Sequence, residues 1–295
     1  MSILLTGRFD AGERDEWLAL LRAELPGETF VLEPGETVDI AVVANPPAGA
    51  LQGLPRLALI QSLWAGVDKL LADASIPAQI PIARMVDPAM NEAMAETALW
   101  AVLSLQRDFF DYARQQAAAS WQPHPQRRAD ELPVLVLGRG QMGTTVARRL
   151  AANGFHVVAW GSRDGPLHAR LADAAVVINL LPLTPATRGI FDAATLAAMR
   201  PGASLVNLAR GAHVVDAALL AALDAGHLRH AVLDVFHQEP LPREHRYWSH
   251  PKVTLLPHVA AATDARSAAA VAAANLKRFR AGAPLEHLVN RARGY

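Results

Sequence analysis

The chain has 295 residues, of which 52% are hydrophobic, and its 28 basic and 28 acidic side chains give a formal net charge of zero. This length is enough for two domains with separate cores, while the balanced charge excludes the basic surface that nucleic-acid binding needs. The absence of cysteine excludes disulfides, thiolate metal sites and a cysteine nucleophile. We find no basic, apolar leader and no membrane-length apolar run, and we expect a cytoplasmic protein without metal, membrane or nucleic-acid partners.

The first part of the chain alternates short apolar strands with helices. Apolar residues recur at helical spacing over residues 13–24, which predicts a helix. The same spacing predicts a long helix from Asn91 to about Ala119, and the proline-interrupted stretch 121–128 that follows is typical of a linker. Strands are predicted at 3–5, 39–43 and 57–60. These elements predict a small α/β unit.

The rest of the chain alternates strands with helices more regularly. The segment 134–137 is apolar throughout, as expected for a strand of a parallel sheet that is covered on both faces. Such alternation predicts a doubly wound α/β sheet. Further strands are predicted at 156–160, 176–180, 204–207, 231–234 and 253–255, and helices around 146–150, at 217–223 and at 265–279.

A glycine-rich turn after the strand at 134–137 predicts a dinucleotide site. Gly138, Gly140 and Gly143 have the spacing G-x-G-x-x-G, and Gln141 and Met142 open the following helix. The first glycine permits a tight turn, the second lets the backbone approach a pyrophosphate, and the third permits close packing of helix on strand. The helix N-terminus then offers N–H groups to the phosphates.

The end of the next strand indicates which dinucleotide is bound. NAD enzymes usually place an acid about 20 residues beyond the glycine turn, where it accepts from the ribose 2′-hydroxyl. Here Trp160 is followed by Gly161-Ser162-Arg163-Asp164. Ser162 and Arg163 can bind a 2′-phosphate, so we predict NADP(H). NAD(H) is the alternative if Asp164 turns in to hold a ribose.

A cation, a carboxylate and an imidazole follow three successive predicted strands: Arg210, Glu239 and His258. Ligands of open α/β sheets bind outside the carboxyl ends of the strands, so we expect these side chains to converge near a nicotinamide. His258 is the expected general acid, because imidazole titrates near neutral pH, and Glu239 favours its protonated form. The guanidinium of Arg210 can bind the carboxylate and carbonyl oxygens of a 2-oxo acid through its several N–H donors, and Asp234 can bind the nicotinamide amide.

Each of these residues also has an ordinary structural interpretation. The chain contains ten other histidines, and His213, His237 and His250 lie near the same motifs. Position in the sequence alone therefore does not choose among them. Arg210 also fits a structural ion pair, and Glu239 before a proline also fits an ordinary turn.

Taken together, the motifs resemble the D-isomer-specific 2-hydroxyacid dehydrogenase family, and most closely its glyoxylate/hydroxypyruvate reductase A group. The resemblance spans nearly the whole chain. It is carried by the segments 178–182, 207–211, 233–236, 238–242, 257–258 and 291–295. It implies that Arg210, Glu239 and His258 are catalytic, and that NADPH delivers hydride to C2 of glyoxylate or hydroxypyruvate, giving glycolate or glycerate.

The resemblance also implies two Rossmann-like doubly wound domains and a homodimer formed through the cofactor domain and linker helix. Residues 1–95 and 270–295 would form a flavodoxin-like substrate-binding domain, and 96–269 an NAD(P)-binding Rossmann domain. Backbone N–H groups in the Trp64-Ala65-Gly66-Val67 turn would bind the substrate carboxylate, as successive N–H groups can do. The remaining implied cofactor contacts are Leu181, Pro182 and Ala209, and Trp121 is implied near the active site.

Two departures from the group leave alternatives open. Ala44-Asn45-Pro46-Pro47 stands where the group has an aromatic residue before its Pro-Pro turn, which predicts a wider pocket and a larger substrate. The stretch between Trp160 and Ile178 is shorter than in the group, so basic residues and a sheet edge are expected to be missing. One alternative is an NAD-dependent D-2-hydroxyacid dehydrogenase acting on a larger 2-oxo acid. The other is a non-catalytic nucleotide-sensing protein on the same fold.

Overall fold

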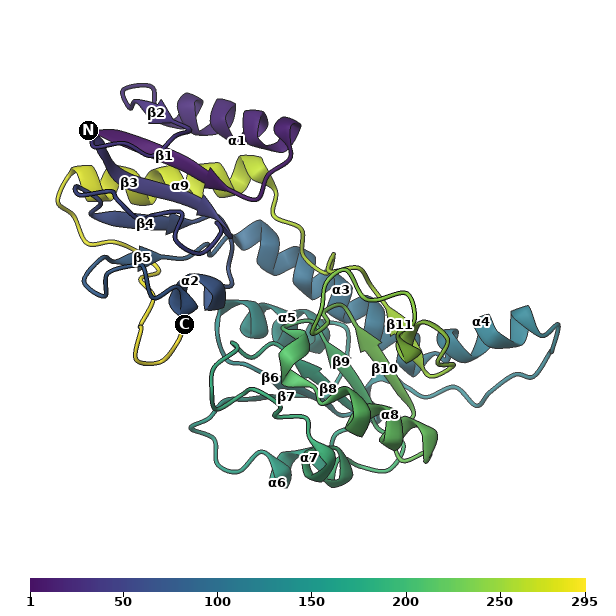
Figure 1. Cartoon of the computed structure of the whole chain (residues 1–295). Helices are drawn as coiled ribbons and strands as arrows, with labels where there is room; N and C mark the ends of the chain where they lie inside the picture. The colour runs from purple at the N-terminus through teal and green to yellow at the C-terminus, as the bar shows by residue number, and fades with distance from the viewer. The chain divides into compact units, whose positions relative to one another are not determined.

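Two parallel β-sheets, each with its own helices, organise the chain in the computed structural model, which describes residues 1–295 (Figure 1). The first unit comprises Met1–Met90 and Thr263–Tyr295, and the second comprises Asn91–Ala262. The α/β fold class predicted from the alternation of strands and helices is therefore confirmed. No helix is long and apolar enough to cross a bilayer.

The sheet of the first unit has the order β2-β1-β3-β4-β5, and all of its pairs are parallel. This is the flavodoxin-like order. Helices α1 and α9 pack against each other, so the end of the chain returns to the unit in which it began (Figure 1). Its elements are β1 (Ser2–Gly7), α1 (Ala11–Glu24), β2 (Phe30–Val31), β3 (Val38–Ala44), β4 (Leu59–Ser62), α2 (Asp68–Ala72), β5 (Ile82–Ala83) and α9 (Ala265–Arg280).

The sheet of the second unit has the order β11-β10-β9-β8-β6-β7, again entirely parallel. The strands are β6 (Val134–Leu137), β7 (Val157–Trp160), β8 (Val176–Asn179), β9 (Ser204–Asn207), β10 (His230–Leu233) and β11 (Val253–Leu255). The helices are α3 (Pro88–Gln106), α4 (Phe109–Ala117), α5 (Gln141–Ala152), α6 (His168–Leu171), α7 (Ala193–Ala198) and α8 (Asp216–Asp224), with short 3₁₀ turns η1 (Ala129–Glu131), η2 (Gly211–His213) and η3 (Arg246–Trp248).

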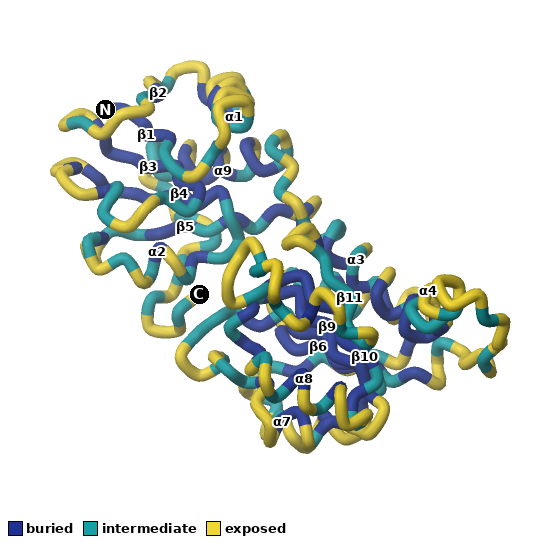
Figure 2. The backbone as a smooth tube through the Cα atoms, turned by 45° about the vertical axis from the view of Figure 1, so that its right-hand side comes forward, coloured by how far each residue is buried: buried dark blue, intermediate teal, exposed yellow.

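Alternate side chains of these strands enter two separate cores, one on each face of the sheet. In β6, Leu135 and Leu137 pack with residues of α7 and α8, whereas Val134 and Val136 pack with residues of α3 and α5. This period of two follows from the pleat of the strand. The inner strands β6, β8, β9 and β10 are buried along their whole length because both faces of the sheet are covered there, whereas the edge strands β7 and β11 are mostly half-buried (Figure 2).

The single long helix predicted from Asn91 to about Ala119 is wrong, because the chain divides into α3 and α4. Asp108 separates them with a left-handed backbone (φ 58°), a conformation that Asp tolerates better than most residues. The Asp108 carboxylate contacts Arg229 and His124, and these partners are distant in sequence. Helical periodicity cannot reveal such a break. No residue of α4 is buried, and Figure 2 shows it in yellow and teal.

Strand β7 forms one edge of the second sheet. The chain passes from β7 through the four-residue α6 to β8, which pairs with β6 instead of continuing outward. In the common 3-2-1-4-5-6 order a further strand would lie outside β7. The short segment after Trp160 thus corresponds to a trimmed edge, where Val158 is 38% exposed.

Candidate active site

His258 and Glu239, which the sequence analysis predicts to be catalytic, form a histidine–carboxylate pair in the second unit. His258 Nδ1 lies 2.7 Å from Glu239 Oε2, and Glu239 Oε1 accepts a hydrogen bond from the backbone N–H of Phe236 at 2.9 Å. Both carboxylate oxygens are therefore engaged, which fixes the orientation of the imidazole. The His258 Nε2 atom makes no hydrogen bond within the chain. The pair thus has the geometry of a general acid whose proton-donating nitrogen is free to meet a ligand.

Asp234 holds the backbone that presents His258. Its carboxylate is 1% exposed and accepts from the N–H groups of Val259 (2.7 Å) and Ala260 (3.1 Å), while its carbonyl accepts from the His258 N–H. These hydrogen bonds hold the backbone on both sides of His258, which has a left-handed conformation (φ 56°) that is uncommon for a residue other than glycine. Burial raises the pKa of Asp234, and the two N–H bonds act in the opposite direction. The nicotinamide contact suggested by the sequence remains a prediction for this residue.

Arg210 follows β9, the strand beside β10, and is half-buried. Its Nη1 donates to the carbonyl of Ala209 at 2.7 Å. The next residue, Gly211, packs directly on the Phe236 backbone, because a Cβ added at Gly211 would lie 2.0 Å from the Phe236 carbonyl carbon. Since Phe236 also binds Glu239, this contact joins the loop of Arg210 to the loop of Glu239.

The glycine turn has the shape that a pyrophosphate site requires. Gly138 has φ 117°, and a Cβ there would lie 2.8 Å from the Leu180 carbonyl oxygen. A Cβ at Gly143 would lie 1.9 Å from the Gly138 carbonyl oxygen, so only glycine permits this approach of α5 to β6. A Cβ at Gly140 would meet open space, which leaves the N-terminus of α5 accessible to phosphate. Gln141 and Met142 begin α5, and the other predicted cofactor contacts, Leu181, Pro182 and Ala209, follow β8 and β9.

The loop after β7 contains an arginine contact that the sequence analysis missed. Arg139 Nη1 donates to Asp164 Oδ1 at 2.7 Å, and Asp164 Oδ2 accepts from the Gly161 N–H at 2.8 Å. Both carboxylate oxygens of Asp164 therefore already accept hydrogen bonds, whereas the side chains of Ser162 and Arg163 are exposed. Arg139 lies in an x position of the glycine motif, where its side chain reaches the end of the neighbouring strand. Since β6 pairs with β7, residues just after the two strands are neighbours, and this adjacency could have identified the contact of Arg139 with Asp164.

In the first unit, the turn after β4 presents three consecutive N–H groups. Those of Ala65, Gly66 and Val67 donate no hydrogen bond within the chain. Trp64 fixes the start of this turn, because its N–H and carbonyl both bond to the Ser62 hydroxyl. Successive unpaired N–H groups form an anion-binding feature.

The other histidines near the motifs have structural partners. His213 is fully buried, with Nδ1 2.9 Å from Asn179, and His237 Nε2 lies 2.7 Å from the Val214 carbonyl oxygen. His250 pairs with Asp224 at 3.1 Å beside the start of β11, away from the carboxyl ends of the strands. Among the histidines that sequence position left equivalent, only His258 is paired with Glu239.

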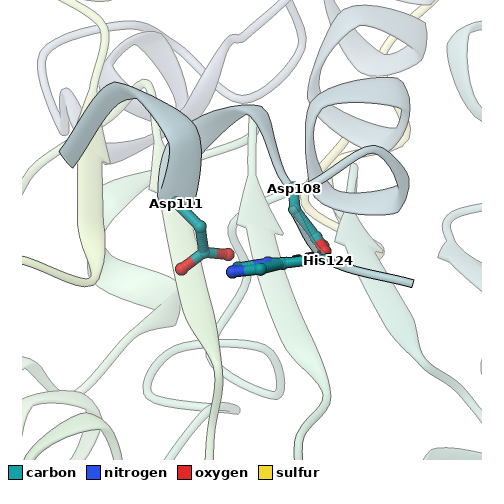
Figure 3. Close-up of side chains that lie close together, drawn as sticks. All are labelled: Asp108, Asp111 and His124. Carbon is teal, nitrogen blue, oxygen red and sulfur yellow. Dashed lines mark hydrogen bonds and ion pairs between the residues drawn. The ribbon is translucent and has the colours of Figure 1, made fainter. Parts of the chain in front are cut away.

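A second cluster of ionisable side chains joins α4 to the linker at 121–128. Figure 3 shows the His124 ring between the carboxylates of Asp108 and Asp111, with candidate ligand atoms within 4.8 Å of one another. Arg229 donates to both carboxylates, and Arg114 donates to Asp111. Burial opposes ionisation of Asp111, but Arg229 and Arg114 hold the pKa of its carboxyl below the usual value. Two guanidinium groups thus balance the negative charge of the two carboxylates. The contact of His124 Nδ1 with Asp108 Oδ2 at 3.0 Å links the linker to the start of α4.

The chain matches a family model described as D-isomer specific 2-hydroxyacid dehydrogenase, NAD binding domain, over residues 99–260. It is 38% identical to glyoxylate/hydroxypyruvate reductase A of Klebsiella pneumoniae (strain 342) over 95% of this chain and 96% of that protein. The same identity and coverage hold for the protein of that name in Serratia proteamaculans (strain 568).

Two solved structures are similar over almost their whole length. A D-isomer specific 2-hydroxyacid dehydrogenase from Xanthobacter autotrophicus Py2, in complex with NADPH and MES, superposes with a TM-score of 0.93 at 35% identity and covers 100% of this chain and 99% of that one. The NADPH-dependent glyoxylate/hydroxypyruvate reductase of Sinorhizobium meliloti, in complex with NADP and sulfate, gives 0.92 at 32% identity and covers 100% of both chains.

Proposed function

The chain belongs to the D-isomer-specific 2-hydroxyacid dehydrogenase family of NAD(P)-dependent oxidoreductases, and from this premise we propose that it reduces glyoxylate to glycolate and hydroxypyruvate to D-glycerate with NADPH. The observation that carries the proposal is the 2.7 Å contact of His258 with Glu239 at the strand ends that also bear Arg210. A protein that only sensed the nucleotide would not need an oriented proton donor. The names of the similar reductases support the choice of substrates.

The residues of the chain divide the chemistry among them. Bound at the glycine turn, the reduced nicotinamide cofactor supplies a hydride to C2 of the 2-oxo acid. His258 Nε2 donates the proton that the carbonyl oxygen takes up, and Glu239 stabilises the imidazolium before transfer. Arg210 binds the carboxylate and polarises the carbonyl. We assign the three unpaired N–H groups of residues 65–67 to the substrate carboxylate as well.

We further propose that the cofactor is NADPH in preference to NADH, and that the protein works as a cytoplasmic homodimer. The similar structures from Xanthobacter and Sinorhizobium contain NADPH and NADP. In this chain Asp164, the acid nearest the end of β7, is engaged by Arg139 and by the Gly161 N–H. A ribose 2′-phosphate would instead find Ser162, Arg163 and Arg139, all suited to an anion.

The direct test of the proposed function measures loss of reduced cofactor with glyoxylate, hydroxypyruvate, pyruvate and phenylpyruvate, each with NADPH and with NADH. We expect the fastest turnover for the two small substrates with NADPH. A preference for phenylpyruvate or NADH would favour the alternative dehydrogenase of larger 2-oxo acids. Tight cofactor binding without any turnover would favour a sensor.

Arg163→Ala and Arg139→Ala should each raise the KM for NADPH by about tenfold while leaving the KM for NADH nearly unchanged, because a charge-assisted hydrogen bond to phosphate is lost. Steady-state kinetics with both cofactors checks this. Arg148→Ala is the control, since Arg148 pairs with Glu92 on the exposed side of α5. Equal changes in KM for both cofactors would argue against a contact to the 2′-phosphate.

A further inference from the structure

Three fully buried polar side chains lie directly beneath the carboxyl ends of two neighbouring strands. Asn179 ends β8, Asn207 ends β9, and His213 lies in η2, which follows the loop of Arg210; each is 0% exposed. Buried polar groups are costly unless hydrogen-bonded, so a cluster of this kind must be satisfied internally. Its bonds connect the loop after β8 with the loop after β9.

Backbone N–H groups determine which way both amides point. The Leu181 N–H can only donate, so the atom that it meets at 3.2 Å is Asn179 Oδ1. The Ala209 N–H likewise identifies Asn207 Oδ1 at 3.3 Å. Asn179 Nδ2 is consequently a donor to Asn207 Oδ1 and to His213 Nδ1, both at 2.9 Å. The order of donors and acceptors is thereby set along the whole cluster.

This order also specifies the form of His213. Its Nδ1 accepts from Asn179, so the ring proton lies on Nε2 and is directed at the Pro182 carbonyl oxygen, 3.3 Å away. At the other end, Asn207 Nδ2 donates to the Arg210 carbonyl oxygen at 3.0 Å. The cluster therefore makes hydrogen bonds to the backbone of Leu181 and Pro182 on one loop, and of Ala209 and Arg210 on the other.

We propose that Asn179, Asn207 and His213 are positioning residues that fix the Arg210 loop and the Leu181–Pro182 loop relative to each other. This role requires the neutral Nε2–H tautomer of His213. The proposal rests on the proposed function insofar as Arg210 binds the 2-oxo acid. Removing His213 leaves Asn179 with an unsatisfied buried donor and takes away one of the two hydrogen bonds that the Pro182 carbonyl accepts, the other coming from the Thr187 hydroxyl at 2.7 Å. The two loops then remain joined through Asn179 and Asn207 alone, so their relative position is less firmly set. The effect reaches the substrate through Arg210, since no atom of the cluster is assigned to the substrate.

The first experiment is ¹⁵N NMR of the histidine rings in the full chain at the assay pH, with the His213 signals assigned by their loss in His213→Asn. We expect a protonated Nε2 and an unprotonated Nδ1. A protonated Nδ1 would overturn the proposal. This measurement does not depend on activity, so it decides the tautomer even if the chain reduces none of the substrates tested.

The second experiment compares steady-state kinetics of His213→Leu, His213→Asn and His230→Leu. The loss of a buried hydrogen-bond partner should raise the KM for the 2-oxo acid about tenfold in His213→Leu. His213→Asn should recover part of this loss, because its amide oxygen can accept from Asn179. His230 is the matched control, since it is also buried and bonds to Thr254 at 2.8 Å, but lies at the start of β10. Burial lowers the pKa of His230 to about 4, so it is also neutral.

The outcomes separate this inference from the proposed function. If the wild type reduces no 2-oxo acid, the proposed function fails. If the wild type is active and His213→Leu has the same KM as His230→Leu, the positioning role fails alone. If His213→Leu does not fold, the KM of His213→Asn decides the positioning role, because it should lie above the wild-type value and a KM equal to the wild type would overturn that role. A protonated Nδ1 in the wild-type NMR spectrum overturns the inference by itself.

Discussion

His258→Ala should lower kcat for glyoxylate reduction by about 10²- to 10⁴-fold, the range that a positioned general acid contributes. The carbonyl oxygen would then have to take its proton from water, while the glycine turn proposed to bind the cofactor pyrophosphate would be unaltered, so the Kd for NADPH should change little. Steady-state kinetics gives kcat, and fluorescence titration gives the Kd for NADPH. Glu239→Gln should produce a smaller loss, because the ring would keep an acceptor but lose the charge that favours imidazolium.

The chain provides a close control for this experiment in a second histidine–carboxylate pair. His250 lies 3.1 Å from Asp224, also in the second unit, but beside the start of β11. His250→Ala should therefore leave kcat near the wild-type value. Unchanged kcat in His258→Ala with ligand binding preserved would eliminate the catalytic role.

The elements that could be predicted from the sequence are those whose signal is local. The strands β6, β9 and β11 were predicted with the bounds that the structure shows. For β6 the signal is four consecutive apolar residues, as expected of a parallel strand covered on both faces. The strands β2 and β5 were missed, since each has two residues and no measurable periodicity. The glycine turn could be predicted because a side chain at Gly138 or Gly143 would clash with the backbone, so the turn requires glycine at these positions.

The features that could not be predicted depend on partners distant in sequence. The break at Asp108 reflects contacts with Arg229 and His124, neither of which belongs to the helix pattern. Asp234 appeared as a cofactor residue, and only the structure shows that its carboxylate binds two N–H groups of the His258 loop. The parallel strand order explains why residues far apart along the chain, such as Glu239 and His258, meet at one end of the sheet.

Arg210→Ala should cause a loss in kcat/KM for glyoxylate of about 10³-fold, since it removes both the ion pair to the carboxylate and the donor to the developing oxyanion. The loss should greatly exceed that of Arg163→Ala with the same substrate, because Arg163 is assigned to the cofactor alone. Arg210→Lys should recover only part of the activity. A lysine keeps the charge but cannot reproduce the planar fork that bonds to two oxygens at once.

The division of the Arg210 effect between kcat and KM would show which interaction matters more. If Arg210 mainly binds the ground-state carboxylate, the loss will appear in KM; if it mainly stabilises the oxyanion as hydride arrives at C2, the loss will appear in kcat. We expect both to change, because one guanidinium can bind a carboxylate oxygen and the carbonyl oxygen of the same 2-oxo acid. Arg188→Ala, an exposed arginine in the loop after β8, supplies the control for a lost surface charge. An Arg210→Ala enzyme that matches Arg188→Ala in both constants would mean that another cation binds the substrate.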